Sequence, residues 1–419
     1  MRDICEMSTA LTIMTVRPQL TIDLRRIGSQ MCGWSSNSFL NPSIITTGVS
    51  NLSPRSKDDL SLFAKTRPWI PNSIGKPVSD CQQSKESLLQ FSVMSYNVLA
   101  QNLLETHTYL YRDCHLKALE WSIRWQGIKR EILDMQPDIV CLQEVQMKNT
   151  NHFVTHYESF FGSLGYRHVM KARTGGKDDG CVIFYKGFMF TLDEMSGLEF
   201  KVDRIKRLDR DNIGLVCRLV PINSPTTPLV IGTTHLLYNP KRTDIRLCQT
   251  AMFLAELDRF SRTPSGSYLP TILTGDLNSD PMSPVVQLLT SGSFQYEGLR
   301  SGRETLPCKL LPDSFGLSDS CQWKDELLQR GLGKHFSTGC GEFSHKFKLQ
   351  SVYSSGSGVT TFQDKWTMVD YIMYSSNQLQ LVAKLELPVD SDMRSFPKIP
   401  SHMSPSDHLP LVALFHLTC

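Results

Sequence analysis

The chain lacks several features that would place it in other classes of protein. Its twelve cysteines include no Cys-x-x-Cys pair and no His/Cys cluster, which argues against zinc and for reduced thiols in the cytoplasm, the nucleus or both. No apolar run approaches the roughly 20 residues of a membrane span, so we expect no membrane association. Lysine and arginine exceed aspartate and glutamate by only three, and a net charge this small does not by itself indicate nucleic-acid binding. The sequence also has no Tyr-x-x-x-x-Leu-hydrophobic segment, the common helical ligand of cap-binding factors.

The N-terminal part differs in composition from the rest. Residues 1–86 are rich in Ser, Asn, Pro and Arg, contain no tyrosine and show no sustained hydrophobic periodicity. Asp3, Glu6 and Asp23 argue against a transit peptide. We therefore predict a disordered or weakly ordered arm over 1–86, followed by a folded domain over 87–419. Within that domain, residues 298–358 have little clear period and are predicted to form an irregular insertion or a substrate lid.

One stretch organises the remaining sequence. Residues 271–274 predict a short buried strand, and Gly275 allows the backbone to turn so that Asp276 and Asn278 both emerge at the strand end. A carboxylate that holds water and an amide that donates to a phosphate suit phosphate chemistry. Alone, the pattern is more often an ordinary turn.

Five other segments place a polar residue at or near the end of an apolar run. If these ends converge, one site contains Asn97, Glu144, His235, Asp276, Asn278, Asp370, Asp407 and His408. Between the strands, helices are predicted over about 116–133, 153–164 and 245–260, the first with Glu131 on its solvent face. Short strands interspersed with helices favour two packed sheets flanked by helices, an α/β fold.

A glycine-containing loop over 173–180 offers a further candidate. Arg173 and Lys177 lie beside two glycines, so cations and backbone amides could together bind a phosphate. A solvated hairpin tip explains the loop equally well.

The ordered motifs resemble the exonuclease-endonuclease-phosphatase superfamily, and within it the Angel proteins, relatives of nocturnin and the poly(A)-removing nucleases. The resemblance runs from about Phe91 to Phe415. It is carried by the motifs around the eight candidate residues and by Angel-like segments: Leu110-Tyr-Arg112, Glu120-Trp-Ser122, Arg173-Thr-Gly175, Thr234–Pro240 and Tyr296–Leu299. It implies a four-layered α/β sandwich and metal-dependent phosphohydrolysis. The leucine-rich domain of some related deadenylases is missing.

Resemblance and chemistry together suggest roles. Glu144 is the expected ligand of Mg²⁺, with Mn²⁺ as the alternative metal, and Asn97 and Asp407 complete or orient the metal shell. Asp276 is expected to position or deprotonate water and Asn278 to bind a phosphate oxygen. Asp370 is expected to orient His408. His235 is expected to donate to the phosphate, and Tyr238 and Trp366 to pack in the core rather than stack on a base.

Three functions remain open at this point. The primary expectation is a phosphohydrolase that acts on an RNA 3′ terminus as a monomer and removes a 2′,3′-cyclic phosphate. The alternatives are a 3′-to-5′ deadenylase-like exonuclease and a catalytically silent scaffold. The candidate residues do not separate the first two, because both attack phosphorus in the same way.

Overall fold

The fold is described from a computed structural model for residues 67–72, 89–148, 151–324, 341–363, 365–376, 378–393 and 396–418. The rest of the predicted N-terminal arm lies outside the described residues. None of the helices in the described parts is long and apolar enough to cross a membrane.

The first large sheet has seven strands and receives both ends of the described chain. In spatial order they are β1 (Trp69–Pro71), β18 (Leu379–Leu385), β19 (Leu411–Leu417), β2 (Leu89–Asn97), β3 (Ile139–Gln146), β5 (Asp179–Lys186) and β4 (Tyr166–Ala172). Only β2 and β3 pair in parallel; the other neighbours are antiparallel. Because β1 pairs with β18, this short part of the expected arm belongs to the sheet.

The second large sheet has six strands built on a similar plan. Their order is β14 (Leu349–Ser351), β17 (Asp370–Ser375), β9 (Thr271–Asp276), β8 (Leu229–His235), β7 (Ile213–Pro221) and β6 (Phe190–Glu199). Here β8 and β9 are the parallel pair, and the remaining pairs are antiparallel. Each parallel pair is joined by a helical crossover, which is what a parallel connection requires.

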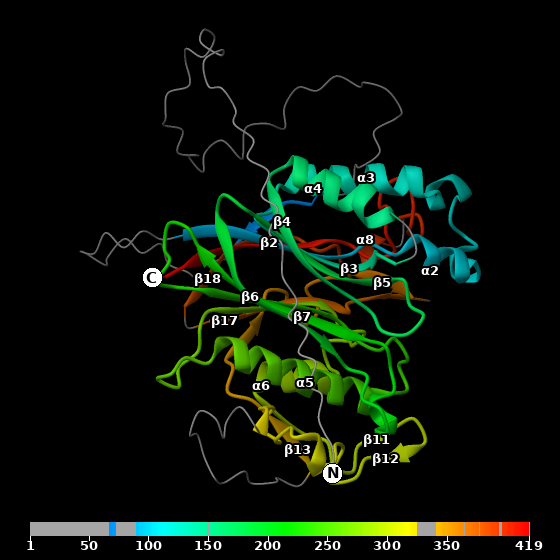
Figure 1. The fold of residues 1–419 in the computed structure, drawn as a ribbon. Helices are drawn as coiled ribbons and strands as arrows, with labels where there is room; N and C mark the ends of the chain where they lie inside the picture. Colours follow the sequence, from blue (N-terminus) through cyan, green and yellow to red (C-terminus); the bar gives the residue numbers. More distant parts are fainter. Residues whose placement is uncertain are drawn as a thin grey trace, which may run out of the picture. The chain divides into compact units, whose positions relative to one another are not determined.

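Helices cover the outer faces of the two sheets, which gives four layers (Figure 1). The longer helices are α3 (Trp121–Met135) and α4 (Ser159–Ser163) with η4 (Phe153–Glu158) on the first sheet, and α5 (Thr243–Ser261) and α6 (Pro284–Ser291) on the second. Short elements complete the chain: α2 (Gln101–Thr106), η2 (Thr108–Tyr111), η3 (Leu116–Leu119), η5 (Lys206–Leu208), η6 (Asp313–Phe315) and α8 (Asp390–Met393). The predicted four-layered α/β sandwich is confirmed.

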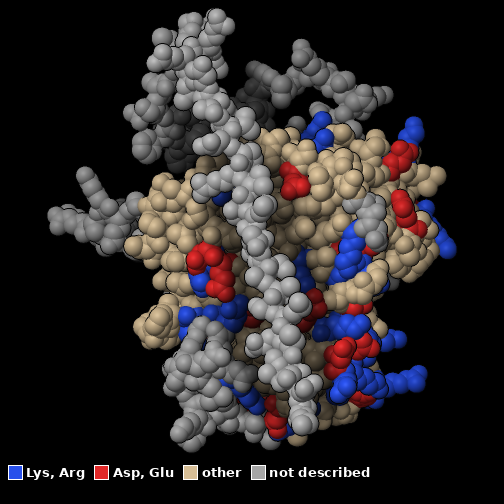
Figure 2. All heavy atoms as spheres, in the orientation of Figure 1, with Lys and Arg blue, Asp and Glu red and all other residues tan. Residues whose placement is uncertain are grey.

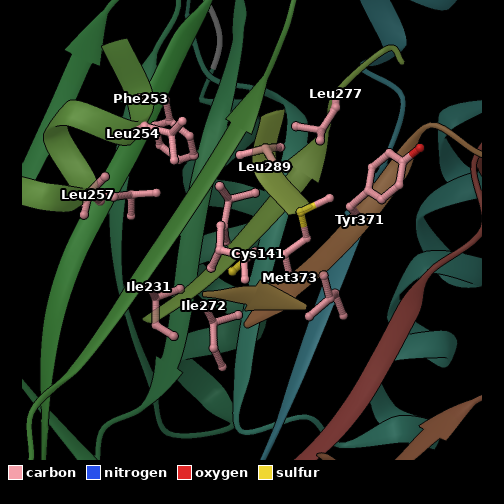
Figure 3. Close-up of a cluster of buried hydrophobic side chains, with 14 of the residues drawn as sticks. Cys141, Ile231, Phe253, Leu254, Leu257, Ile272, Leu277, Leu289, Tyr371 and Met373 are labelled. Atoms are coloured by element: carbon pink, nitrogen blue, oxygen red, sulfur yellow. The ribbon is translucent and has the colours of Figure 1, made fainter. Parts of the chain in front are cut away.

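The core is formed where the inner faces of the sheets meet and where the helices cover them. Figure 3 shows Cys141 of the first sheet near Ile231, Ile272 and Met373 of the second, with residues of α5 beyond them. These side chains are almost completely buried. All seven cysteines within the described residues are free, and five of them are buried, in keeping with reduced thiols.

The described parts of residues 298–358, predicted as an irregular insertion or a substrate lid, contain short strands and turns. Strands β10 (Ser293–Gln295) and β13 (Glu342–Ser344) pair with each other, as do β11 (Arg300–Ser301) and β12 (Glu304–Thr305). They lie beyond α5 and α6 (Figure 1). The Trp323 indole donates to Glu256 of α5 at 3.0 Å, and Gln322 donates to Asp258 at 3.2 Å. These contacts explain how α5 buries charged residues on the face that turns away from the sheet.

The surface agrees with the small net charge. On the face shown in Figure 2, basic and acidic side chains are interspersed and do not separate into one basic surface. On this face, recognition of a charged ligand would depend on a local arrangement of residues.

Candidate active site

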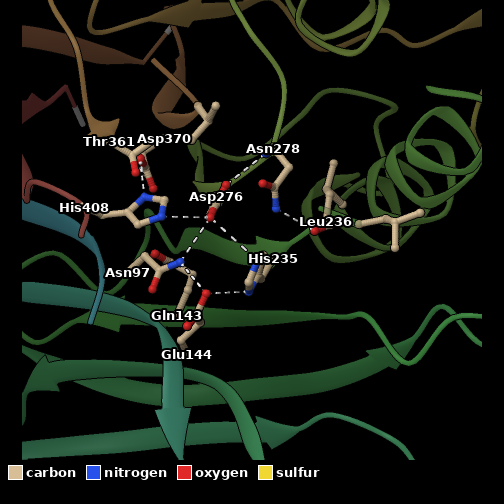
Figure 4. A network of polar contacts seen from close by, with 12 residues as sticks. Asn97, Gln143, Glu144, His235, Leu236, Asp276, Asn278, Thr361, Asp370 and His408 are labelled. Atoms are coloured by element: carbon tan, nitrogen blue, oxygen red, sulfur yellow. Dashed lines mark hydrogen bonds and ion pairs between the residues drawn. The ribbon is translucent and has the colours of Figure 1, made fainter. Parts of the chain in front are cut away.

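Strand ends from both sheets meet at one edge of the sandwich. The parallel pair β2 and β3 brings Asn97 opposite Gln143, and the parallel pair β8 and β9 brings His235 opposite Asp276. Strand β17 runs the other way, so its first residue, Asp370, also lies opposite Asp276. Parallel strands that end at this edge and an antiparallel strand that begins there explain why distant residues converge (Figure 4).

Glu144 reaches the site through a bulge in β3. The register between β3 and β5 shifts between Leu142 and Val145, and Glu144 adopts a left-handed backbone with φ of 56°. Such a φ is uncommon for a residue other than glycine and costs conformational energy, which the pairing around it must supply. The bulge turns the carboxylate of Glu144 toward Asn97 and His235.

Asp276 depends on the close approach of β8 and β9. A Cβ at Gly275 would lie 2.0 Å from the carbonyl oxygen of Thr234, and Gly275 has a φ of 139°, so only glycine fits. Asn278 follows with a left-handed φ of 47°. Its backbone N–H donates to Asp276 Oδ1 at 2.9 Å, and its side-chain amide donates to the Leu236 carbonyl at 2.9 Å.

Asn97 connects the two carboxylates. Its Nδ2 donates to Glu144 Oε1 at 3.0 Å and to Asp276 Oδ2 at 3.0 Å, while its Oδ1 accepts from the backbone N–H of Leu99 at 3.0 Å. The amide orientation is assigned from these partners. In this arrangement Asn97 offers hydrogens to the site, so it orients the carboxylates of Glu144 and Asp276.

Two histidines flank Asp276. His235 Nε2 lies 3.6 Å and His408 Nε2 3.7 Å from Asp276 Oδ2. Asp370 Oδ2 lies 2.9 Å from His408 Nδ1, which matches the predicted orienting pair. Two buried atoms of the site, His235 Nδ1 and Asp370 Oδ1, have no hydrogen-bond partner in the described protein.

Burial and mutual repulsion shift the protonation of this group. Burial, with the charges of Asp407 and Asp179, raises the pKa of Glu144 to about 7. Burial and Asp370 also raise the pKa of Asp276. Burial acts to lower the pKa of His408, but Asp370 and Asp276 outweigh it and hold that pKa well above its usual range. Burial lowers the pKa of His235. Several buried carboxylates thus compete for few positive charges.

The donor atoms suit a divalent cation. Glu144, His235 and Asp276 each offer one ligand atom, and these atoms lie within 4.8 Å of one another; Asp276, Asp370 and His408 form a second such group. Carboxylate oxygens are the ligands that Mg²⁺ prefers, and a cation would offset the burial and the neighbouring negative charges that raise the pKa of Glu144. The residues present therefore fit a metal.

These groups open onto a cavity of about 350 Å³. Six of the predicted residues line it: Glu144, His235, Asp276, Asn278, Asp407 and His408. Asn97 and Asp370 lie behind them and contact Asp276 and His408. Arg173 and Lys177 also line the cavity, although Arg173 already pairs with Asp179 at 3.3 Å and donates to the Asp211 carbonyl at 3.2 Å.

Some residues at the cavity were missed or misjudged. Tyr111 donates to Asp407 Oδ2 at 2.8 Å, and Asn212 donates to the His235 carbonyl at 3.0 Å. Tyr111 belongs to the Leu110-Tyr-Arg112 segment that carries the resemblance, which predicts no role for it, and Asn212 precedes the apolar run of β7 rather than following it. Tyr238 is 57% exposed and lines the cavity, so the expectation of core packing is wrong for it. Trp366 does pack against Phe362, with ring centroids 5.2 Å apart.

Comparison with known proteins agrees with this geometry. The model of the endonuclease/exonuclease/phosphatase family matches residues 94–408. Protein angel homolog 2 of Homo sapiens is 36% identical over 389 residues, which cover 80% of this chain and 71% of that protein. Protein angel of Drosophila melanogaster is 31% identical and covers 86% of this chain and 89% of its own.

Solved structures give the same picture. The crystal structure of ANGEL2, a 2′,3′-cyclic phosphatase, in complex with adenosine-2′,3′-vanadate has a TM-score of 0.73 and 36% identity, and covers 84% of this chain and 99% of its own. The human nocturnin catalytic domain with bound sulfate has a TM-score of 0.55 at 22% identity, and covers 85% of this chain and 98% of its own, which shows a shared fold.

Proposed function

The chain belongs to the Angel proteins of the endonuclease/exonuclease/phosphatase family, and from this premise we propose that it removes 2′,3′-cyclic phosphate from RNA 3′ ends with the help of Mg²⁺. The observation that carries the proposal is the arrangement around Asp276. Its Oδ2 accepts from Asn97 and lies within 3.7 Å of two imidazoles, on the wall of a cavity that also contains Glu144. The likeness to ANGEL2, a 2′,3′-cyclic phosphatase, supports the choice of substrate.

The proposed reaction uses two molecules of water. The first attacks phosphorus and breaks one of the two P–O bonds to the ribose, which leaves a phosphomonoester and a free hydroxyl. The second breaks the remaining P–O bond and releases inorganic phosphate, so the RNA keeps its length and ends in a 2′,3′-diol. Both steps build negative charge on the phosphate oxygens and on the leaving oxygen.

Glu144 is proposed to hold the metal, with Asp407 nearby and Asn97 orienting the carboxylate. When bound, Mg²⁺ would supply charge neutralisation at the phosphate and the leaving oxygen. Mn²⁺ takes the same class of oxygen ligand and would fit the same residues. The hydrogen bond from the Ala100 backbone N–H to Glu144 Oε2, at 3.3 Å, fixes the other carboxylate oxygen.

Asp276 is proposed to orient the attacking water and take its proton. The Asn278 backbone N–H and the Asn97 amide occupy one position on each Asp276 oxygen, so the carboxylate cannot rotate freely. His408, which Asp370 and Asp276 keep positively charged, and neutral His235 lie on either side as donors to a phosphate oxygen. Lys177 and Arg173 on the cavity wall would add positive charge for the substrate phosphate.

The test uses 5′-labelled RNAs that end either in a 2′,3′-cyclic phosphate or in an oligo(A) tail. We expect the cyclic end to become a diol without shortening, and we expect EDTA to abolish the reaction and added Mg²⁺ to restore it. A ladder of shortened products would instead identify an exonuclease. No change in either RNA with Mg²⁺ or Mn²⁺ would overturn the proposal and favour a scaffold.

A further inference from the structure

A second cavity adjoins the active-site cavity. Its volume is about 590 Å³, and five residues line both cavities: Tyr109, Leu110, Tyr111, Tyr238 and Asp407. Both volumes fall within the roughly 300–1,000 Å³ typical of ligand sites. The shared residues place the two cavities side by side, so a ligand that extends along Tyr109 and Tyr238 would contact both.

The shared wall is fixed by a hydrogen bond. Tyr111 is 7% exposed and donates its hydroxyl to Asp407 Oδ2 at 2.8 Å. Asp407 is in turn connected to the adjoining loop, since its carbonyl accepts from Thr361 Oγ1 at 2.7 Å. The part of the shared wall formed by Tyr111 and Asp407 is therefore held in place by the fold.

The second cavity combines exposed aromatic rings with two basic side chains, Arg112 and Lys398, and two acidic ones, Asp113 and Asp407. Tyr109 and Tyr238 are each 57% exposed, and exposed aromatic rings gathered at one cavity indicate a binding site. Arg112 lies on the same wall, and the Lys398 ammonium lies 5.2 Å from the centroid of the Phe362 ring while it pairs with Asp113. Aromatic platforms beside cations are the chemistry that binds single-stranded nucleic acid, because every base has a face that stacks.

We infer that this second cavity binds the nucleotide that precedes the terminal one in single-stranded RNA. The inference rests on the proposed function, which places the terminal cyclic phosphate in the first cavity. The RNA chain leaves the terminal ribose through its 5′ oxygen, so the preceding nucleotide must occupy an adjoining space. Tyr109 and Tyr238 provide surfaces for its base, and Arg112 attracts the connecting phosphate.

The experiment compares two substrates of different length. The measured quantity is kcat/KM for adenosine 2′,3′-cyclic phosphate and for a triadenylate that ends in the same group. We expect the triadenylate to be favoured by about tenfold or more, the value that one stacked base provides. Tyr109→Ala and Tyr238→Ala should each reduce that preference by about five- to tenfold, whereas Tyr109→Phe and Tyr238→Phe should keep it.

The control is an aromatic residue away from both cavities. Phe188 is 66% exposed in the turn between β5 and β6, and Phe188→Ala should keep the wild-type preference. Arg112→Gln should lower the preference and weaken its dependence on salt, because a phosphate contact releases counterions.

The outcomes separate the inference from the proposed function. Equal kcat/KM for both substrates, or a preference that Tyr109→Ala and Tyr238→Ala do not reduce, would overturn the second cavity's role and leave the cyclic phosphatase intact. Hydrolysis of neither substrate would overturn the proposed function. In that case the Kd values of fluorescently labelled triadenylate and of the labelled mononucleotide decide. If Tyr109→Ala and Tyr238→Ala weaken the binding of the triadenylate more than that of the mononucleotide, the RNA site is upheld. If neither variant changes the Kd of the triadenylate, the RNA site is refuted.

Discussion

The protein buries charged side chains in two neighbouring places, and the partners of these charges differ. Under α3, the Arg124 guanidinium donates to the carbonyls of Pro405 at 2.7 Å, Val98 at 2.6 Å and Leu99 at 2.7 Å, and to Gln101 Oε1 at 2.8 Å. In the active site, carboxylates and imidazoles face one another and a cavity. A buried charge surrounded by carbonyls holds the fold together. A group of buried charges that compete with one another beside a cavity is prepared for a ligand.

The two places are connected by the segment that follows β2. Asn97 orients Glu144 and Asp276, and the next two residues, Val98 and Leu99, accept from Arg124. Ala100 then donates its backbone N–H to Glu144 at 3.3 Å. The structural charge thus holds the backbone on which the reactive charges depend, and substitutions can separate the two roles.

Glu144→Gln should have the largest effect, a loss of about a thousandfold in kcat for the cyclic phosphate, because the amide keeps the shape but not the charge that a metal needs. The activity should also depend less steeply on Mg²⁺ concentration. Steady-state kinetics over a Mg²⁺ titration, with the urea midpoint of unfolding as the control for folding, provide the measurement. An unchanged rate at saturating Mg²⁺ would rule out Glu144 as the metal ligand.

Arg124→Met should have the next largest effect, and on stability first. Removal of the guanidinium leaves buried carbonyls without donors, which should lower the free energy of unfolding by about 3 kcal/mol or more. Equilibrium urea unfolding measures this change, and Arg124→Lys is the matched variant that keeps one charge and loses the fork of donors. A free energy of unfolding within error of the wild type would show that Arg124 is not structural.

Asp370→Asn tests the buried charges of the active site, and its effect on the reaction should be smaller than that of Glu144→Gln. Asp370 lies 2.9 Å from His408, does not line the cavity and acts on the site through His408 and Asp276, so kcat should fall by about 10- to 100-fold. Because Asp370 helps to keep the pKa of His408 high, the pH at which the imidazole loses its proton should move downward. NMR titration of His408 in the wild type and in Asp370→Asn measures this shift, and an unmoved titration would contradict the positioning role.

Much of the site could be predicted because strand ends carry it. Apolar runs followed by Asp, Asn or His indicate where parallel strands finish, and the fold gathers such ends at one edge. The bulge that turns Glu144 inward could not be predicted, since it depends on how β3 pairs with β5. Helix α6 was missed although Ser283 accepts from the Val286 N–H as an N-cap and Gly292 ends the helix with a φ of 83°.

The charged residues of a helix were harder to place in the sequence than the strand ends. The prediction that Glu131 faces solvent is wrong, since it lies on the buried face of α3 and is 1% exposed. Arg124 of the same helix is 0% exposed. Periodicity identifies the apolar face of a helix, but it does not show that a sheet offers carbonyls to a buried guanidinium. In the same way, β1 pairs at the edge of the sheet through three residues, too few to give a strand pattern.

Glu131 provides the most specific test of the structural charges. Burial raises its pKa from 4.5 to about 8, an effect that Tyr96 and Arg67 oppose and Asp134 of the same helix supports. A carboxyl with a raised pKa in the folded state binds its proton more tightly there than in the unfolded chain, so stability should fall as the pH rises from about 4.5 to about 8.

The variant Glu131→Gln has no carboxyl proton to lose. Its melting temperature relative to the wild type should therefore rise between pH 5 and pH 8, by about 5 °C or more. Gln126→Ala, at an exposed and non-titratable position on α3, is the matched control and should show no such trend. If the difference in melting temperature between Glu131→Gln and the wild type stays constant with pH, Glu131 keeps its negative charge in the folded protein. Tyr96 and Arg67 would then stabilise that charge enough to offset the effect of burial.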